Sequence, residues 1–223
     1  MPGLQAGTGD KHKMMPKAQV NPIFPEAIVE VSNVGIDQEK IQSLYAQQEW
    51  TATNPDDNAE YFLQISKNLK VLNGDNEFRS KILGMVNEYA RDVMRYKNKF
   101  YLTTSWFVKT EKNKISVMHN HGNAMISAVY YFGLAKNTKA KIIFERPFQN
   151  QFDLKPIDYN IFNGPSHKFE LGNDSLIIFP SHLKHKVVRH ENPETRKSLA
   201  MNFMPKGMAG AGTTELDLGD SET

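Results

Sequence analysis

Cysteine is missing from this chain of 223 residues. Its absence excludes disulfide bonds, thiolate nucleophiles, and zinc or iron–sulfur centres held by cysteine. Any metal ion must therefore be bound by histidine, aspartate, glutamate or backbone oxygen. The seven histidines are the first residues to consider as ligands.

Long apolar runs and an excess of charge are also missing. No run approaches the ~18–20 apolar residues of a membrane span, and the N-terminal segment MPGLQAGTGDKHKMMPKAQ lacks the apolar stretch of a secretory signal. The 27 basic and 25 acidic residues leave a net charge of only +2, which gives no strong signal for a nucleic-acid partner. We therefore expect a cytoplasmic protein with no membrane partner.

The two ends of the chain differ in character from its middle. Residues 1–20 and 206–223 are rich in glycine and small residues and show no periodicity, so we expect a mobile arm and a mobile tail. Residues 21–98 are expected to form an N-terminal strand and supporting helices. Residues 99–205 are expected to form a jelly-roll core, in a single domain with residues 21–98.

Helical periodicity is confined to the first half. A short apolar run at 27–31 predicts a strand, and residues 38–48 predict a helix. Apolar residues spaced by three and four predict a second helix over 76–96, and Asp75 or Asn76 could cap it. We expect this helix to pack on the outside of the β-structure.

The second half offers short β-rich runs separated by turn residues. In order they are FYLTTSWFV, ISVM, MISAVYYF, AKIIF, KFEL, SLIIFP, HKVV and SLAMNFM. Strands at such regular spacing are typical of a sandwich or jelly roll. The fold class we predict is mainly β with supporting helices, a double-stranded β-helix.

Two histidines stand directly before one of these strands, in the segment MHNHGNAMISAVYYF. In extended chain the side chains of His119 and His121 point the same way, so the pair could supply two metal ligands. A third ligand, distant in the sequence, could be His182 or His185, after SLIIFPS. The plain alternative is a polar turn that happens to carry histidines. His12, His167 and His190 show no obvious partner and are expected to be ordinary side chains.

A possible anion site follows the last of these histidines. Arg196 and Ser198 would share one face of a strand, and Ala200 and Asn202 would continue that face. An arginine on the inner face of a barrel is costly unless it meets an anion. Its planar guanidinium suits a carboxylate held by two hydrogen bonds.

The order of these motifs resembles that of the 2-oxoglutarate- and iron(II)-dependent dioxygenases. HNHGNAMISAVYYF, IIFPSHLKHKVV and RKSLAMNF together are similar to a family of 2-oxoglutarate/iron oxygenases of about this length found in bacteria and tailed phages. The similarity runs in outline from Phe24 to Asn202. It implies a double-stranded β-helix, Fe(II) as cofactor, 2-oxoglutarate as cosubstrate, and hydroxylation of an unknown substrate.

The resemblance also implies roles for individual residues. His119 and His185 would be iron ligands, and His182 would not. Arg196 would bind the C5 carboxylate of 2-oxoglutarate with help from Ser198. Tyr131 would contact the same molecule, and Asn202 is placed with them as a cosubstrate-binding residue.

His121 departs from the pattern, since the superfamily usually has Asp or Glu there. We expect His121 to be the third ligand, which gives a site of three neutral imidazoles, with metal affinity falling as the pH drops through the free-histidine range near ~6.5. Alternatively Glu145 or Asp174 completes the site. Trp106 or Phe107 could line the pocket, although a core position is the plainer reading of Trp106.

Two functions of other classes fit the same residues. One is a jelly-roll module that binds a metal or small acid without catalysis. The other is a cupin-type iron enzyme that does not use 2-oxoglutarate. An inward Arg196 favours the oxygenase over both. The loops expected at the barrel mouth, 122–125, 146–156 and 158–165, leave protein, nucleobase, lipid and small-metabolite substrates open.

Overall fold

The computed structural model describes residues 19–53, 61–148, 152 and 154–219. Most of the predicted N-terminal arm and part of the 146–156 loop lie outside these residues. The helices are α1 (Gln38–Ala46), α2 (Asn76–Glu88), a π-helical turn (Tyr89–Val93) and a 3-10 turn (Gly212–Thr214). The strands are β1 (Val29–Ser32), β2 (Trp50–Ala52), β3 (Gln64–Ser66), β4 (Phe100–Thr110), β5 (Ile126–Phe132), β6 (Ala140–Glu145), β7 (Ser166–Leu171), β8 (Ser175–Pro180), β9 (His185–Val187), β10 (Arg196–Pro205), β11 (Met208–Ala209) and β12 (Leu216–Asp217).

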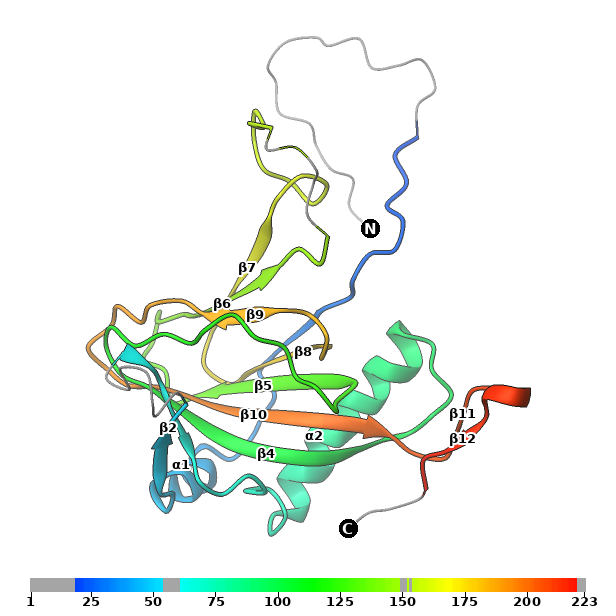
Figure 1. Ribbon diagram of the computed structural model, residues 1–223. Coiled ribbons are helices and arrows are strands. Elements are labelled where there is room, and N and C mark those ends of the chain that lie inside the picture. Colours follow the sequence, from blue (N-terminus) through cyan, green and yellow to red (C-terminus); the bar gives the residue numbers. More distant parts are fainter. Residues whose placement is uncertain (1–18, 54–60, 149–151, 153, 220–223) are drawn as a thin grey trace.

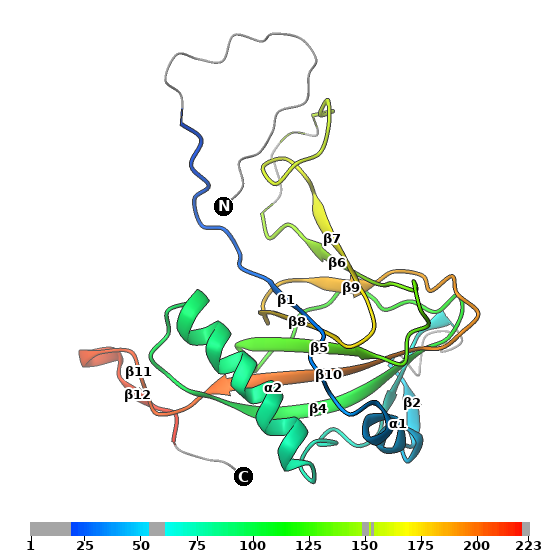
Figure 2. The same ribbon diagram turned by 180° about the vertical axis from the view of Figure 1, so that it is seen from behind.

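Two antiparallel sheets form the body of the protein. A seven-stranded sheet has the order β1-β8-β5-β10-β4-β3-β2, and a three-stranded sheet has the order β7-β6-β9. In Figure 1 the smaller sheet lies over one face of the larger one, and the β6–β7 hairpin projects away from it. Figure 2 shows α2 crossing the opposite face of the large sheet. The predicted jelly roll with an outer helix is confirmed.

One predicted strand is wrong. ISVM, residues 115–118, forms no ladder. Ile115 makes an isolated bridge to Phe62, and His119, just beyond the segment, makes one to His185. The segment's three apolar residues, Ile115, Val117 and Met118, do not alternate strictly, so they set no strand register by themselves. In the segment predicted as a tail, β11 pairs with β12 in a short hairpin.

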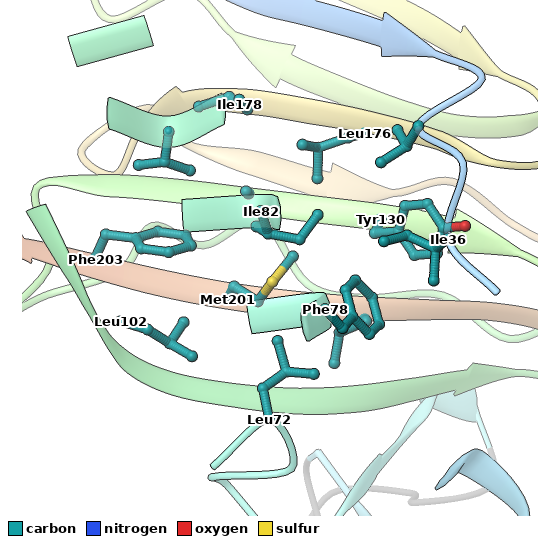
Figure 3. Close-up of a cluster of buried hydrophobic side chains, with 14 of the residues drawn as sticks. Ile36, Leu72, Phe78, Ile82, Leu102, Tyr130, Leu176, Ile178, Met201 and Phe203 are labelled. Carbon is teal, nitrogen blue, oxygen red and sulfur yellow. The ribbon is translucent and has the colours of Figure 1, made fainter. Parts of the chain in front are cut away.

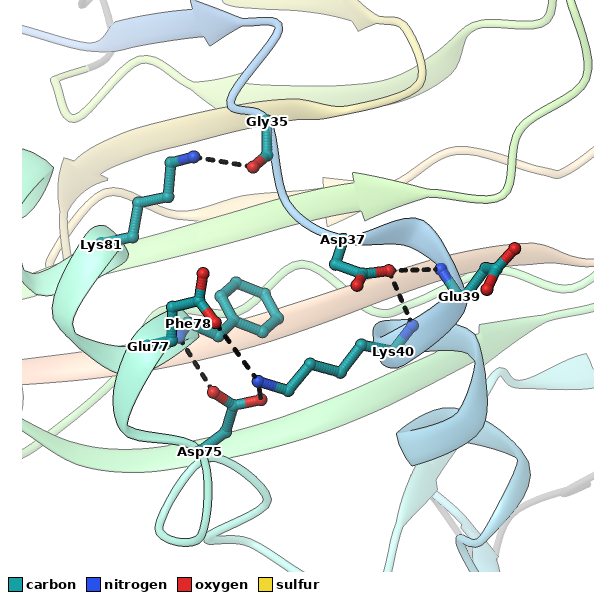
Figure 4. Close-up of polar contacts among 8 residues, drawn as sticks. All are labelled: Gly35, Asp37, Glu39, Lys40, Asp75, Glu77, Phe78 and Lys81. Carbon is teal, nitrogen blue, oxygen red and sulfur yellow. Dashed lines mark hydrogen bonds and ion pairs between the residues drawn. The ribbon is translucent and has the colours of Figure 1, made fainter.

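Both helices begin at an aspartate. Asp37 accepts hydrogen bonds from the backbone N–H of Glu39 and Lys40, and Asp75 accepts one from Phe78. Lys40 links the two helices, because its ammonium lies 2.8 Å from an Asp75 carboxylate oxygen (Figure 4). The predicted cap at Asp75 is therefore confirmed, and the cap is tied to α1 by an ion pair.

The large sheet separates two apolar clusters, because side chains alternate between its faces along every strand. We call the cluster between the sheet and the helices the outer core; Figure 3 shows its centre. The cluster between the two sheets is the inner core. Outer-core residues include Leu72, Phe78, Ile82, Tyr130, Leu176, Ile178, Leu199, Met201 and Phe203. Inner-core residues include Val108, Val129, Tyr131, Ile142, Ile177, Phe179, Leu183 and Ala200.

Among the described residues, no helix has the length and apolar character needed to cross a membrane.

Candidate metal and cosubstrate site

Three histidines meet between the two sheets. The possible ligand atoms of His119, His121 and His185 all lie within 4.8 Å of one another. The ring centroids of His119 and His185 are 4.4 Å apart, and those of His121 and His185 are 5.1 Å apart. His185 begins β9, while the other two precede β5. The structure thus brings together the three histidines that the sequence singled out.

The backbone fixes how two of these histidines approach. The N–H of His119 donates to the carbonyl of His185 at 3.0 Å, and the N–H of His185 donates to the carbonyl of His119 at 2.8 Å. This reciprocal pair holds the end of the irregular 115–119 segment against β9. It explains why His119 reaches the site although its segment forms no strand.

Each of the three rings has a partner at Nδ1. His119 Nδ1 lies 2.9 Å from the carbonyl of Val117, and His185 Nδ1 lies 2.9 Å from that of Leu183. His121 Nδ1 lies 2.6 Å from Asn202 Oδ1. A carbonyl oxygen only accepts, so Nδ1 carries the proton and Nε2 keeps its lone pair. Three imidazoles with free Nε2 atoms and anchored Nδ1–H groups fit a divalent metal.

Burial keeps two of these rings uncharged. The pKa of His185 is lowered to about 3, mainly by burial and also by the nearby His119 and His121, against the raising effect of the hydrogen bond to the Leu183 carbonyl. Burial also lowers the pKa of His121, although the hydrogen bond to Asn202 opposes that shift. A metal ligand must be deprotonated. Proton competition at these two residues therefore begins below the ~6.5 of free histidine, and our expectation of a loss at ~6.5 needs this correction.

The other candidate ligands lie elsewhere. His182 pairs with Glu26, its Nε2 lying 3.0 Å from a carboxylate oxygen. The carboxylate of Asp174 accepts from the Tyr130 hydroxyl at 2.6 Å and from the Gly35 N–H at 2.8 Å, on the outer face of the sheet. Among the described residues, the cluster of metal-ligating groups contains no carboxylate.

Glu145 and the remaining histidines are also accounted for. Glu145 ends β6 and is not part of the cluster. His190 lies outside the metal-ligating cluster, as expected; its side chain is buried, and its Nε2 donates to the carbonyl of Glu194 at 2.6 Å. His167 packs against Phe169 on β7.

Arg196 is buried without a counter-ion. The residue is only 2% exposed, and its guanidinium donates to the Thr110 hydroxyl at 3.2 Å and weakly to the Lys141 carbonyl at 3.4 Å. Its Nε atom is buried with no hydrogen-bond partner. No ion pair among the described residues includes Arg196, so neither Glu191 nor Glu194 neutralises it.

A buried unpaired guanidinium has a direct electrostatic cost. Burial lowers the pKa of Arg196, yet arginine does not give up its proton in proteins. The charge therefore stays in a region of low polarity, where a small-molecule anion would stabilise it. The Nε atom without a partner and the partly used amino groups leave hydrogen-bond donors for a carboxylate. The residues present therefore fit 2-oxoglutarate.

A cavity of about 270 Å³ connects the histidines to the predicted cosubstrate residues. Tyr131 and Ser198 line it. Arg196 is not among the lining residues, but its guanidinium carbon lies 5.9 Å from the centre of the Tyr131 ring. Trp106 lines it too, with its ring 5.6 Å from His121, whereas Phe107 belongs to the outer core. The wall is completed by Thr53, Leu63, Ile65, Val108, Ser116, Val117, Val129, Ile142, Val187 and Ala200.

Asn202, like Arg196, is not among the residues that line the cavity. It shares the inward face of β10, and its amide oxygen contacts the His121 ring. Ser127 and Ser181 join this contact and were not assigned a role from the sequence. Ser127 could have been found by alternation, since it shares the face of Tyr131 on β5. Ser181 could not, because only the fold brings it beside Ser127.

Part of the chain matches a known protein family. Residues 104–202 match the family model described as "Putative 2OG-Fe(II) oxygenase". The match spans β4 to β10 and contains all three histidines and Arg196. The matched segment, which is less than half of the chain, is thus similar to the 2-oxoglutarate/Fe(II) oxygenases. This similarity agrees with the oxygenase that the motifs predicted. No curated protein matches it in sequence.

Solved structures of this class share its fold. A 2OG-Fe(II) oxygenase family oxidoreductase from Burkholderia pseudomallei has a TM-score of 0.53 at 13% identity, covering 79% of this chain and 83% of that one. A Pseudomonas putida prolyl-4-hydroxylase has 0.51 at 12%, covering 79% and 92%. HygX from Streptomyces hygroscopicus, with nickel, 2-oxoglutarate and hygromycin B bound, has 0.55 at 10%, covering 81% and 83%.

Proposed function

We propose that this 2-oxoglutarate/Fe(II) oxygenase is a hydroxylase whose metal is held by three neutral histidines, His119, His121 and His185. The observation that carries the proposal is the buried Arg196, which has no counter-ion among the described residues and lies beside Tyr131, a residue that lines the same cavity as the histidines. A dicarboxylate anchored at one end by Arg196 and directed at the histidines would satisfy both features.

The roles of the protein's own groups follow from their placement. The possible ligand atoms of the three rings lie within 4.8 Å of one another, and the partners at Nδ1 restrain the rotation of the rings and leave Nε2 for the metal. Arg196 and Ser198 would grip the far carboxylate of 2-oxoglutarate, with the Tyr131 ring packed beside it. The apolar wall would exclude water and so strengthen this pairing. Fe(II) bound here would supply the activation of oxygen.

The overall stoichiometry of the proposed reaction is balanced. One O₂, one 2-oxoglutarate and one C–H bond give succinate, carbon dioxide and one hydroxyl group, with one oxygen atom in succinate and the other in the product. Among the described residues that line the cavity there is no Asp, Glu, Lys or Arg, because Arg196 lies outside this lining, beside Tyr131. The group presented to the metal is therefore expected to be uncharged.

Release of labelled carbon dioxide from 2-oxoglutarate tests the proposal. The purified full chain is incubated with Fe(II), ascorbate and 1-[¹⁴C]-2-oxoglutarate in air, and Arg196→Met serves as the matched variant. We expect slow release by the wild type, abolished by chelator and strongly reduced in the variant. Metal binding without any release, at saturating 2-oxoglutarate and over many hours, would instead indicate the non-catalytic module. Oxygen consumption at a rate that does not depend on 2-oxoglutarate would indicate the cupin-type enzyme.

A further inference from the structure

The ring of His121 is anchored differently from the other two. His119 and His185 each bond the backbone carbonyl two residues earlier, at Val117 and Leu183. Every residue supplies a carbonyl, so substitution does not remove these anchors. His121 depends on a side chain from another strand, Asn202 on β10. Of the three rings, only that of His121 is held at Nδ1 by a side chain, so a substitution can remove this anchor.

The contacts around Asn202 set the direction of the hydrogen bonds. Asn202 Oδ1 lies 2.6 Å from His121 Nδ1 and 2.9 Å from the Ser127 hydroxyl, which donates to it. The Ser127 hydroxyl lies 2.8 Å from that of Ser181, which can donate to it in turn. The chain of donors thus runs from Ser181 through Ser127 to the amide oxygen. An oxygen that accepts from both sides requires the proton of His121 on Nδ1.

The backbone of His121 is tied to the same group. Its N–H donates to the Ser181 carbonyl at 3.0 Å, so Ser181 holds the main chain while Asn202 holds the ring. His121 and Ser127 also contact each other directly at 3.0 Å. Position and rotation of the ring are both determined by these three residues.

We propose that Asn202 is a positioning residue that keeps His121 in its Nδ1–H tautomer and aims Nε2 at the metal. This rests on the proposed function, because it takes His121 as a ligand. Reversal of the amide would make Nδ2 the donor and move the imidazole proton to Nε2, which would block binding. Residue 202 also sets the electron density of the third ligand, since a carboxylate there would make a more basic imidazole.

Two substitutions at this position and one control test the proposal. Asn202→Asp keeps an acceptor oxygen of the same shape and adds charge, whereas Asn202→Leu removes the acceptor. Thr104→Val is the matched control, because Thr104 faces Asn202 across the β4–β10 pairing and its buried hydroxyl has no hydrogen-bond partner. The full chain is titrated with Co(II) against a chromophoric chelator, and the histidine tautomers of the metal-free proteins are read by ¹⁵N NMR.

We expect Asn202→Asp to bind Co(II) at least as tightly as the wild type and to keep the Nδ1–H tautomer. Asn202→Leu should bind ~10–100-fold more weakly, the usual loss when a ligand's hydrogen-bond partner is removed, with a mixed tautomer at His121. Thr104→Val should match the wild type. If Asn202→Leu does not fold, Ser127→Ala replaces it, with a smaller loss in the same direction.

Equal affinity in the wild type and Asn202→Leu, or an Nε2–H tautomer in the metal-free wild type, overturns the proposal. A wild type that binds no Co(II) overturns the proposed function instead. In that event the tautomer still decides the role of Asn202: a wild-type Nδ1–H form lost in Asn202→Leu supports it, and a form unchanged by the substitution rejects it.

Discussion

The two faces of the large sheet use the same strands for opposite purposes. On β10, Leu199, Met201 and Phe203 enter the outer core, while Arg196 and Ser198 face the inner side. The outer face is packed by helices until its apolar side chains are fully enclosed. The inner face keeps a cavity, a charged group without a partner, and three imidazoles with free nitrogen atoms.

Neighbouring residues show the contrast most directly. The hydroxyl of Tyr130 is satisfied on the outer face by Asp174 and Gln38, whereas Tyr131 lines the cavity. Satisfied polar groups stabilise the fold, and unsatisfied ones cost free energy unless a ligand completes them. The comparison teaches that stability resides mainly on one face and binding on the other, so substitutions should separate the two properties.

Removal of a ligand should give the largest effect. His185→Ala removes one of the three Nε2 atoms proposed to bind the metal. We expect metal affinity to fall by more than the ~10–100-fold that loss of a ligand's hydrogen-bond partner causes. Calorimetric titration with Ni(II) measures it. His182→Ala is the control, because that ring pairs with Glu26 away from the site. Similar affinities for both variants would end the three-histidine assignment.

A substitution on the outer face should lower stability and leave metal affinity unchanged. Phe203 is 1% exposed beside α2, and Phe203→Ala should lower the free energy of unfolding by ~3–5 kcal/mol. Metal affinity below the unfolding transition should stay at the wild-type value. Urea denaturation and the same titration provide the two readings. A matching loss of metal affinity would show that the two faces are not independent.

Loss of the inner-face charge should weaken the cosubstrate alone. Arg196→Met is expected to reduce the affinity for 2-oxoglutarate by ~2–5 kcal/mol, the usual cost of breaking a desolvated charge pair. The ligand-free protein should unfold at the same urea concentration or a higher one, since a buried charge without a counter-ion has been removed. Marked destabilisation with unchanged 2-oxoglutarate binding would assign Arg196 to the structure instead.

The paired tyrosines offer the smallest and most selective test. Tyr130→Phe removes the hydroxyl that donates to Asp174 and should cost ~1–2 kcal/mol of stability, without changing 2-oxoglutarate binding. Tyr131→Phe should leave stability nearly unchanged and weaken 2-oxoglutarate binding. Thermal unfolding and 2-oxoglutarate titration of both variants are compared. Exchanged phenotypes would mean that the inward and outward faces of β5 have been misassigned.

Much of this arrangement could be predicted from the sequence because alternation is strict within strands. It placed Arg196 on the face of Ser198, and the resemblance to the oxygenases pointed to Tyr131, which the structure places in the cavity wall. The separation of His185 from His182 depended on the resemblance to a family. Period-two reasoning could not exclude Asp174, whose role becomes clear only when the fold brings Gly35 and Tyr130 to it.

The errors come from long-range contacts. The 115–118 segment has the composition of a strand, but its neighbours leave it only isolated bridges. Asn202 lies on the predicted face, yet one step beyond the cavity, next to the point where the β4–β10 register shifts between Asn202 and Phe203. A register shift caused by one extra residue on the partner strand leaves no mark in the sequence of β10 itself.

The reciprocal bonds between His119 and His185 have a consequence for hydrogen exchange. Both amide hydrogens are engaged in one closed pair, so the chain before β5 cannot move off β9 without releasing both to solvent. The two amides should therefore exchange with deuterium at a common rate when opening is the limiting event. Because the same opening pulls the two rings apart, that rate measures the lifetime of the assembled site in the protein without metal or substrate.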